Sequence, residues 1–307
     1  MSEQEVKLKG VDISEFNGNV DFEKLKDQVD FVILRASFGK KEDKMFRKNA
    51  KECIKYNIPF GVYYYSYAMS KAYGLEEVSF FISTIKDFKD HITYPAIIDM
   101  EDSDGYKKKA GMPKDEVFVE IIKKACDILR TAGLYPMVYA SKDWFETKLK
   151  TLEKEEKWLA WWNRKALDEI DKIEYKMLQY ASDGKVEGIE GNVDLNYSFI
   201  DFHKLITYLK NIEKLQFIQI RTGLEAISMQ YLSCYKWGKE LVDKIYKRLL
   251  DSRKIENPED PIDKIIKDEF NLEDKTIQYL KYYVYYEDLE LKLYKALSGV
   301  TIINEGE

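Results

Sequence analysis

The sequence is poor in the residues that several common catalytic and binding sites need. It has two histidines and three cysteines in 307 residues, and the cysteines lack metal-type spacing. We therefore do not expect a Ser-His-Asp triad or a histidine-rich zinc site, and we expect no metal and no cofactor. A net charge of −6 without a long basic face argues against nucleic acid as a partner. No apolar run is long enough to span a bilayer, so we expect no membrane insertion.

The most informative segment that is present is an apolar run at 94–101, which is typical of a buried strand and ends on Asp99 and Glu101. Residues i and i+2 of a strand lie on the same face, about 6–7 Å apart along the backbone. Repulsion and desolvation then raise the proton affinity of at least one carboxyl. A neutral acid beside an anion is what cleavage of a glycosidic bond requires. For an isolated pair, the alternative of a strand that merely ends in solvated acids is the commoner case.

Three further segments give the acid pair a context. Residues 10–14 form a short apolar strand that carries Asp12, and residues 191–196 place Asp194 after a glycine turn. Residues 58–67 are typical of an aromatic strand suited to lining a sugar groove. An acid inside an apolar strand is costly unless it is paired or exposed at a mouth. We therefore interpret these segments as converging on one site.

Six segments between about residues 8 and 205 resemble, in order, the lysozymes of glycoside hydrolase family 25, the Chalaropsis-type muramidases. They are G-V-D-I-S, I-P-F-G-V-Y-Y-Y, Y-P-A-I-I-D-M-E, Y-P-M-V-Y, W-L-A-W-W and G-x-V-D-L-N. The resemblance implies a β/α barrel that cleaves the β-1,4 bond between N-acetylmuramic acid and N-acetylglucosamine in peptidoglycan. It also implies that Glu101 is the general acid and that Asp99 is ionised and supports attack by the substrate's own N-acetyl group. Asp12 and Asp194 would hold the substrate and tune this pair.

The residue pattern predicts a similar architecture without the resemblance. Strands are expected at 11–14, 31–37, 60–68, 94–101, 135–141, 157–163, 176–182 and 193–198. Helical segments follow the first five, at 21–28, 43–56, 70–88, 114–132 and 142–150. This alternation indicates an α/β fold with a parallel sheet, and a closed barrel of that kind has its working residues at the C-terminal strand ends. Because the last three strands leave little room for helices, we expect an irregular, TIM-like barrel.

Several of these residues have more than one interpretation. Asp12 could be a turn or helix cap, and Asp194 could form an Asx-type turn. Arg35 could meet a carboxylate of the glycan or form a surface ion pair. The lysines at 107–109 could steer the anionic wall, although a solvated loop is the simpler interpretation. Aromatic rings could stack on sugars or belong to the core. The candidate substrate-binding residues are Arg35, Tyr63, Tyr65, Tyr139, Trp162 and Gln179.

From about residue 210 the alternation gives way to helix alone. We expect a catalytic barrel at 1–209, a short linker at 210–215 and a small helical domain at 216–307. Thr222 and Glu225 have the spacing of a capping box that would open the first of three helices.

Two more signals predict the remaining helices of this domain. Asn257-Pro258 would begin the second helix and Asn271 the third, which Ser298-Gly299 would close. Tyrosines are frequent at 279–286, so some of them are expected to be exposed or covered by a partner. Wall binding is the favoured role, self-association into a homo-oligomer is its rival, and a purely structural cap on the barrel is the third possibility.

These features together predict a peptidoglycan-degrading muramidase whose partner is the bacterial wall. The first residues lack the basic and apolar regions of a secretory signal. We therefore expect a phage endolysin, kept in the host cytoplasm and released to the wall through a holin-type membrane lesion. The alternatives are a barrel that binds peptidoglycan without cutting it, and a related glycosidase that acts on another polysaccharide. All four acids at their motif positions argue against the non-catalytic alternative.

Overall fold

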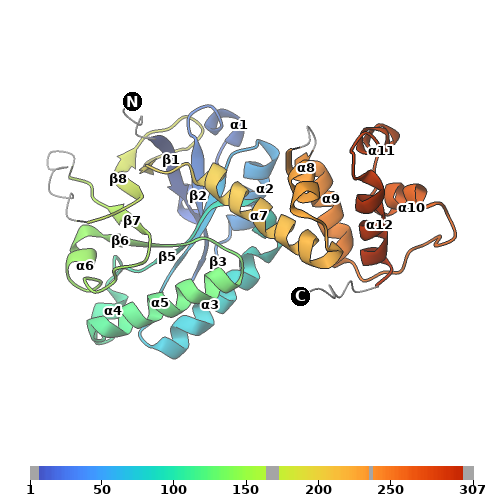
Figure 1. Cartoon of the computed structure of the whole chain (residues 1–307). Helices are drawn as coiled ribbons and strands as arrows, with labels where there is room; N and C mark the ends of the chain where they lie inside the picture. Colours follow the sequence, from blue (N-terminus) through green and yellow to red (C-terminus); the bar gives the residue numbers. More distant parts are fainter. Residues whose placement is uncertain (1–6, 164–172, 235–237, 300–307) are drawn as a thin grey trace, which may run out of the picture. The chain divides into compact units, whose positions relative to one another are not determined.

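The computed structural model describes residues 7–163, 173–234 and 238–299, and the chain divides into two compact units, Met1–Ile206 and Thr207–Glu307. Among the described residues of the first unit, eight strands close a barrel, and a short strand, β3 (Lys41–Glu42), is paired to the end of the second (Figure 1). The barrel strands are β1 (Leu8–Ile13), β2 (Phe31–Phe38), β4 (Phe60–Tyr65), β5 (Ile92–Asp99), β6 (Pro136–Ser141), β7 (Lys157–Ala160), β8 (Met177–Gly184) and β9 (Val193–Ser198).

The direction of β9 makes the barrel irregular. Neighbouring strands from β1 through β8 are parallel, whereas β9 is antiparallel to both β8 and β1. The connection at 185–192 is too short for a crossover helix, so the chain returns beside β8 in the opposite direction. The predicted α/β class and the irregular barrel are confirmed.

Helices cover the outside of the barrel where the sequence pattern placed them. The helices of this unit are η1 (Glu15–Asn17), α1 (Phe22–Leu25), α2 (Phe46–Lys55), α3 (Lys71–Ile85), η2 (Lys86–His91), α4 (Tyr106–Lys109), α5 (Asp115–Thr131) and α6 (Lys142–Glu146). The first predicted segment is shortened to a single turn, in which Asp21 caps the backbone N–H of Lys24. Helix α4 lies in the segment that was expected to be a solvated loop.

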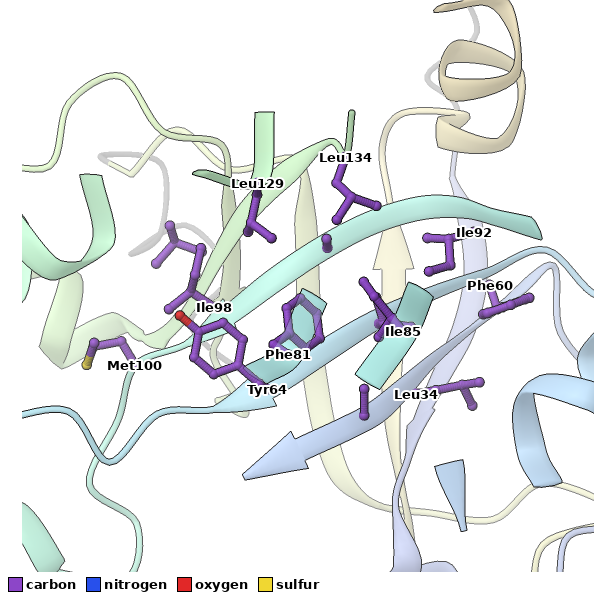
Figure 2. Packing of buried hydrophobic residues seen from close by; sticks show 14 of the residues in the cluster. Leu34, Phe60, Tyr64, Phe81, Ile85, Ile92, Ile98, Met100, Leu129 and Leu134 are labelled. Atoms are coloured by element: carbon purple, nitrogen blue, oxygen red, sulfur yellow. The ribbon is translucent and has the colours of Figure 1, made fainter. Parts of the chain in front are cut away.

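Successive side chains on each barrel strand point to opposite faces. One set packs inside the barrel, and the other packs between the strands and the helices. Tyr64 is fully buried toward the helices and its ring lies 4.9 Å from that of Phe81 (Figure 2). Its neighbour Tyr63 belongs to the inner set and packs edge-on against Trp158 at 6.4 Å. Tyr63 and Tyr65 therefore share a face opposite Tyr64, as expected from the period of a strand. Aromatic packing fills the barrel floor, which leaves the polar residues at its rim.

The second unit is helical and has its own apolar core. Its helices are α7 (Phe202–Thr222), which begins in the first unit, then α8 (Ala226–Cys234), α9 (Gly238–Leu250), α10 (Ile262–Glu269), α11 (Asp274–Leu280) and α12 (Tyr286–Leu297). Residues 210–215, expected to form a linker, lie within the continuous helix α7. Apolar residues keep helical spacing through this segment, which explains why no loop interrupts it.

The predicted capping box at Thr222 is wrong. Thr222 is the last residue of α7: its Oγ1 donates to the carbonyl of Ile218 at 2.7 Å and accepts from the backbone N–H of Leu224 at 3.3 Å. A threonine hydroxyl can bond main-chain groups at either end of a helix, so its place in the sequence does not show which end it caps. The main-chain carbonyl of Glu225 accepts from the N–H of Met229 at the start of α8, and its side chain lies 3.8 Å from Lys292 Nζ.

The prediction of three helices in this unit is also wrong. Helix α10 starts after Pro261 and not at Pro258, because residues 257–260 form a turn. Asn271 has a left-handed φ of 49° and follows the end of α10. The expected third helix is split into α11 and α12 at 281–285, where tyrosine and valine have weak helix propensity. Gly299, with a φ of 74°, follows α12 as predicted.

Candidate active site

The four predicted acids come together at one end of the barrel. Asp99 is the last residue of β5 and Glu101 follows two residues later, while Asp12 is near the end of β1. Asp194 is at the start of β9, directly opposite Asp12 in the antiparallel register. Because β9 is reversed, its first residues lie at the same rim as the C-terminal ends of the parallel strands. The electrostatic influence of Asp12 and Glu101 on Asp194 is consistent with this grouping.

Asp12 is held by a hydrogen-bond network. Its Oδ2 accepts from Gln179 Nε2 at 3.0 Å and from Asn196 Nδ2 at 2.8 Å. Both amides are oriented by aromatic donors. Trp158 Nε1 donates to Asn196 Oδ1 at 2.9 Å. Gln179 Oε1 accepts from the Tyr139 hydroxyl at 2.9 Å and from Trp162 Nε1 at 3.0 Å. The network fixes the Asp12 carboxyl, so the interpretation of Asp12 as a simple cap is wrong.

Asp12 and Asp194 form a carboxyl pair joined by a hydrogen bond. Burial, the charge of Asp12 and this bond raise the pKa of Asp194 to about 8. Burial also raises the pKa of Asp12, although the amide donors of Asn196 and Gln179 favour its anion. The raised pKa of Asp194 favours its protonated form at neutral pH, in which its hydroxyl can donate to Asp12.

Asp99 and Glu101 form the second carboxyl pair. Burial raises the pKa of Glu101 to about 7, against an opposing effect of Lys107. Burial and the neighbouring charge of Glu101 raise the pKa of Asp99 well above its usual value. Asp99 Oδ1 is buried and has no hydrogen-bond partner among the described residues. Burial and Glu101 thus oppose the ionised Asp99 that we expected, whereas the positive charges of Lys107 and Arg35 favour it.

Three other candidate residues lie around these pairs. Burial raises the pKa of Tyr63, and the charges of Asp12, Asp99 and Asp194 raise it further, so the Tyr63 hydroxyl faces the site. The Tyr65 hydroxyl lies 3.4 Å from both Ser103 Oγ and Asp104 Oδ1. Trp162 is 54% exposed, which leaves its ring open at the rim while its Nε1 is bound to Gln179.

Tyr139 and Gln179 are largely buried within the hydrogen-bond network behind Asp12. Their visible role is to orient that carboxyl, and stacking of Tyr139 on a sugar stays a prediction.

Arg35 is buried, so the expected alternative of a surface ion pair is wrong. Its Nε donates to Asp43 Oδ2 at 2.8 Å, and Nη2 lies 3.8 Å from Glu15 Oε1. The guanidinium also lies between the rings of Phe16 and Phe38. Its charge lowers the pKa of Asp99, although burial dominates there. Recognition of a glycan carboxylate by Arg35 stays a prediction.

Three residues that matter to the site were missed from the sequence. Asn196 is two residues after Asp194 on β9, and this spacing could have identified it. Asp43 follows β3 and binds Arg35, a contact that no local pattern indicates. Lys107 is 0% exposed, so the solvated-loop interpretation is wrong for it. The described residues contain no group of three or more His, Cys, Asp or Glu arranged to hold a metal ion.

Paired carboxylates at the strand ends of a β/α barrel suit hydrolysis of glycosidic bonds. Its residues 11–189 match the family described as Glycosyl hydrolases family 25. This match takes in more than half of the 307 residues, and the chain belongs to that family.

Three known proteins show how far the likeness extends. The uncharacterized protein YegX of Escherichia coli O157:H7 is 23% identical over 196 residues, which cover 62% of this chain and 68% of YegX. The modular autolysin LytC of Streptococcus pneumoniae, solved with a synthetic peptidoglycan ligand, is 31% identical with a TM-score of 0.58. That likeness covers 64% of this chain and 47% of the LytC chain, so this chain spans about half the length of LytC.

The third is the catalytic domain of endolysin ply40 from bacteriophage P40 of Listeria monocytogenes, which is 23% identical with a TM-score of 0.55. It covers 66% of this chain and 98% of that domain, and it shows a shared fold.

Proposed function

We propose that the protein is a muramidase that hydrolyses the β-1,4 bond between N-acetylmuramic acid and N-acetylglucosamine in peptidoglycan. The observation that carries the proposal is the crowding of buried Asp99 and half-buried Glu101, with a Glu101 pKa of about 7. A carboxyl with that pKa holds its proton for part of the time at neutral pH and can donate it to a leaving oxygen.

We infer a two-step reaction with retained configuration, as the resemblance to the family implies. Glu101 protonates the glycosidic oxygen as the bond breaks, while the N-acetyl oxygen of the substrate attacks the anomeric carbon. Positive charge develops on the sugar beside Asp99, and the ionised Asp99 carboxylate stabilises that charge. Water then opens the cyclic intermediate, and Glu101 accepts the proton of that water. The Asp12–Asp194 pair holds the substrate from the opposite side of the rim.

The experiment uses purified cell walls and measures both turbidity and new reducing ends. Reduction of the digested glycan with borotritide should label muramic acid, and the fresh product should have the β configuration. Label on glucosamine would indicate a glucosaminidase. Sedimentation with walls without new reducing ends would favour the alternative of a non-catalytic binding barrel.

We further propose that the enzyme is a phage endolysin that reaches the wall from the host cytoplasm through a holin-type lesion. Support comes from the shared fold with a phage endolysin domain and from the absence, in the described residues, of a helix able to cross a membrane. Expression with and without a co-expressed holin tests this step. Lysis that depends on the holin supports it, and equal lysis without one contradicts it.

The second unit is proposed to bind the cell wall. Its surface has a cluster of exposed residues around the turn between α11 and α12, where Tyr282 is 84% and Val284 86% exposed. Exposed rings suit contact with sugars, whereas an apolar patch also suits a second copy of the chain. Self-association is therefore the second candidate, and the truncation experiment in the Discussion distinguishes the two.

A further inference from the structure

Lys107 brings a buried positive charge to the edge of the acid cluster. It is on the short helix α4, and its Nζ donates to the main-chain carbonyls of Ser66 and Glu101, each at 2.5 Å. The ammonium also lies 5.3 Å from the ring centre of Tyr65 and 5.9 Å from that of Tyr67. Among the described residues, no carboxylate oxygen lies within ion-pair distance of Nζ. Burial of an ammonium without a carboxylate in ion-pair contact costs free energy, so the position of Lys107 requires an explanation.

The two carbonyls belong to the segments that leave neighbouring strands. Glu101 is beyond the end of β5, so the sheet ladder does not hold it. Ser66 follows β4, and its N–H donates to the carbonyl of Asp99 at 2.9 Å. Its hydroxyl donates to Glu77 Oε2 at 2.6 Å, which fixes this segment to helix α3. Lys107 thereby joins the main chain of Glu101 to an anchored neighbour.

Four carboxyls that are not ion-paired with Lys107 still act on its charge at longer range. Asp99, Asp102, Glu77 and Asp104 all favour its protonated form, although burial lowers its pKa overall. In turn, Lys107 is the strongest of the effects that oppose the burial-driven rise in the pKa of Glu101. It also opposes the rise in the pKa of Asp99 that burial and Glu101 cause.

We propose that Lys107 is a positioning residue of this active site: it fixes the main chain of Glu101 and supplies the counter-charge that allows one of two crowded carboxyls to ionise. The inference rests on the proposed muramidase function for its activity measurement. Lys107 contacts main-chain oxygens and aromatic rings. It affects the reaction indirectly, through the position of Glu101 and the ionisation of Glu101 and Asp99.

The test compares Lys107→Met with Lys107→Arg, and uses Lys108→Met as the control because Lys108 is an exposed neighbour on the same helix. Loss of the positive charge leaves both carboxyls harder to ionise. Both limbs of the pH–activity profile should then move to higher pH by about one unit or more, as for removal of a close opposite charge. kcat should fall with little change in KM. Lys107→Arg should keep the limbs in place, and Lys108→Met should match the wild type.

Limbs that stay in place in Lys107→Met, with only a lower maximum, would mean a packing role and would overturn the proposal. If Lys107→Met does not fold, Lys107→Gln provides the same test, because it removes the charge but retains N–H donors for the carbonyls. Titration of the Glu101 carboxyl carbon by NMR, assigned with Glu101→Gln, measures the same shift without turnover. A wild type that releases no reducing ends would refute the muramidase function, whereas an unshifted Glu101 titration would refute the role of Lys107.

Discussion

Asp12 and Asp194 face each other across the antiparallel β1–β9 pair, and burial together with the charge of Asp12 raises the pKa of Asp194. The folded state holds the Asp194 proton to about pH 8, whereas an unfolded aspartate releases it near its ordinary value of 3.8. Between these values the folded chain binds more protons than the unfolded chain, so this group makes stability fall as pH rises.

Asp194→Asn should remove that dependence, because the amide keeps a donor for Asp12 and does not titrate. The urea midpoint of the barrel, followed by tryptophan fluorescence, should fall less between pH 5 and pH 8 in the variant than in the wild type. Some turnover should remain. Parallel midpoints in the two proteins would contradict the raised pKa of Asp194.

Glu101→Gln should fold normally and lose lytic activity by about 10²–10⁴-fold, because the amide cannot donate the proton that the leaving oxygen needs. Asp99→Asn should be similarly severe. Release of reducing ends from purified walls measures both variants. Glu153→Gln, at an exposed position away from the strand ends, is the control. Near-native activity in folded Glu101→Gln would remove the assignment of the acid.

The activity of the wild type should fall as pH rises through about 7, where Glu101 loses its proton. The sign follows from its role, since the protonated form is the competent acid. Initial rates of wall hydrolysis from pH 5 to pH 9 measure this limb. Any residual activity of Glu101→Gln should lack it, and a limb that persists in that variant would belong to another group.

Removal of the second unit should separate hydrolysis from targeting. A fragment ending at Gly223 retains every barrel strand and the whole of α7. It should release reducing ends from purified walls as the full chain does but lyse intact cells less well, because the second binding contact is lost.

The fragment 207–307 should sediment with walls if the unit binds them, or run larger than its mass if it self-associates. Tyr282→Ser should weaken that behaviour, whereas Tyr208→Ser, at an exposed tyrosine outside the α11–α12 turn, should not. If the fragment does neither and truncation leaves lysis unchanged, both roles are wrong. An insoluble barrel fragment would indicate that the helices serve as a structural cap.

The strand ends were predictable because their signals are local. An apolar run that ends on acids identifies Asp99, an acid within a short apolar strand identifies Asp12, and a glycine turn precedes Asp194. Strand alternation correctly separates Tyr63 from Tyr64. Other features depend on packing between distant segments. The burial of Lys107 depends on segments that follow two different strands, and its two lysine neighbours on α4 are exposed. Thr222 was misread because one hydroxyl can serve either end of a helix.

The acid cluster can be completed only after β9, the last strand of the barrel, has been synthesised. Asn196 and the Asp12 carboxyl that it binds are 184 residues apart in sequence, at opposite ends of the barrel's share of the chain. A nascent polypeptide on the ribosome can form the first strands, but it has no complete acid cluster until the last one emerges and docks. A chain that ended before β9 would therefore have an open barrel and an incomplete acid cluster.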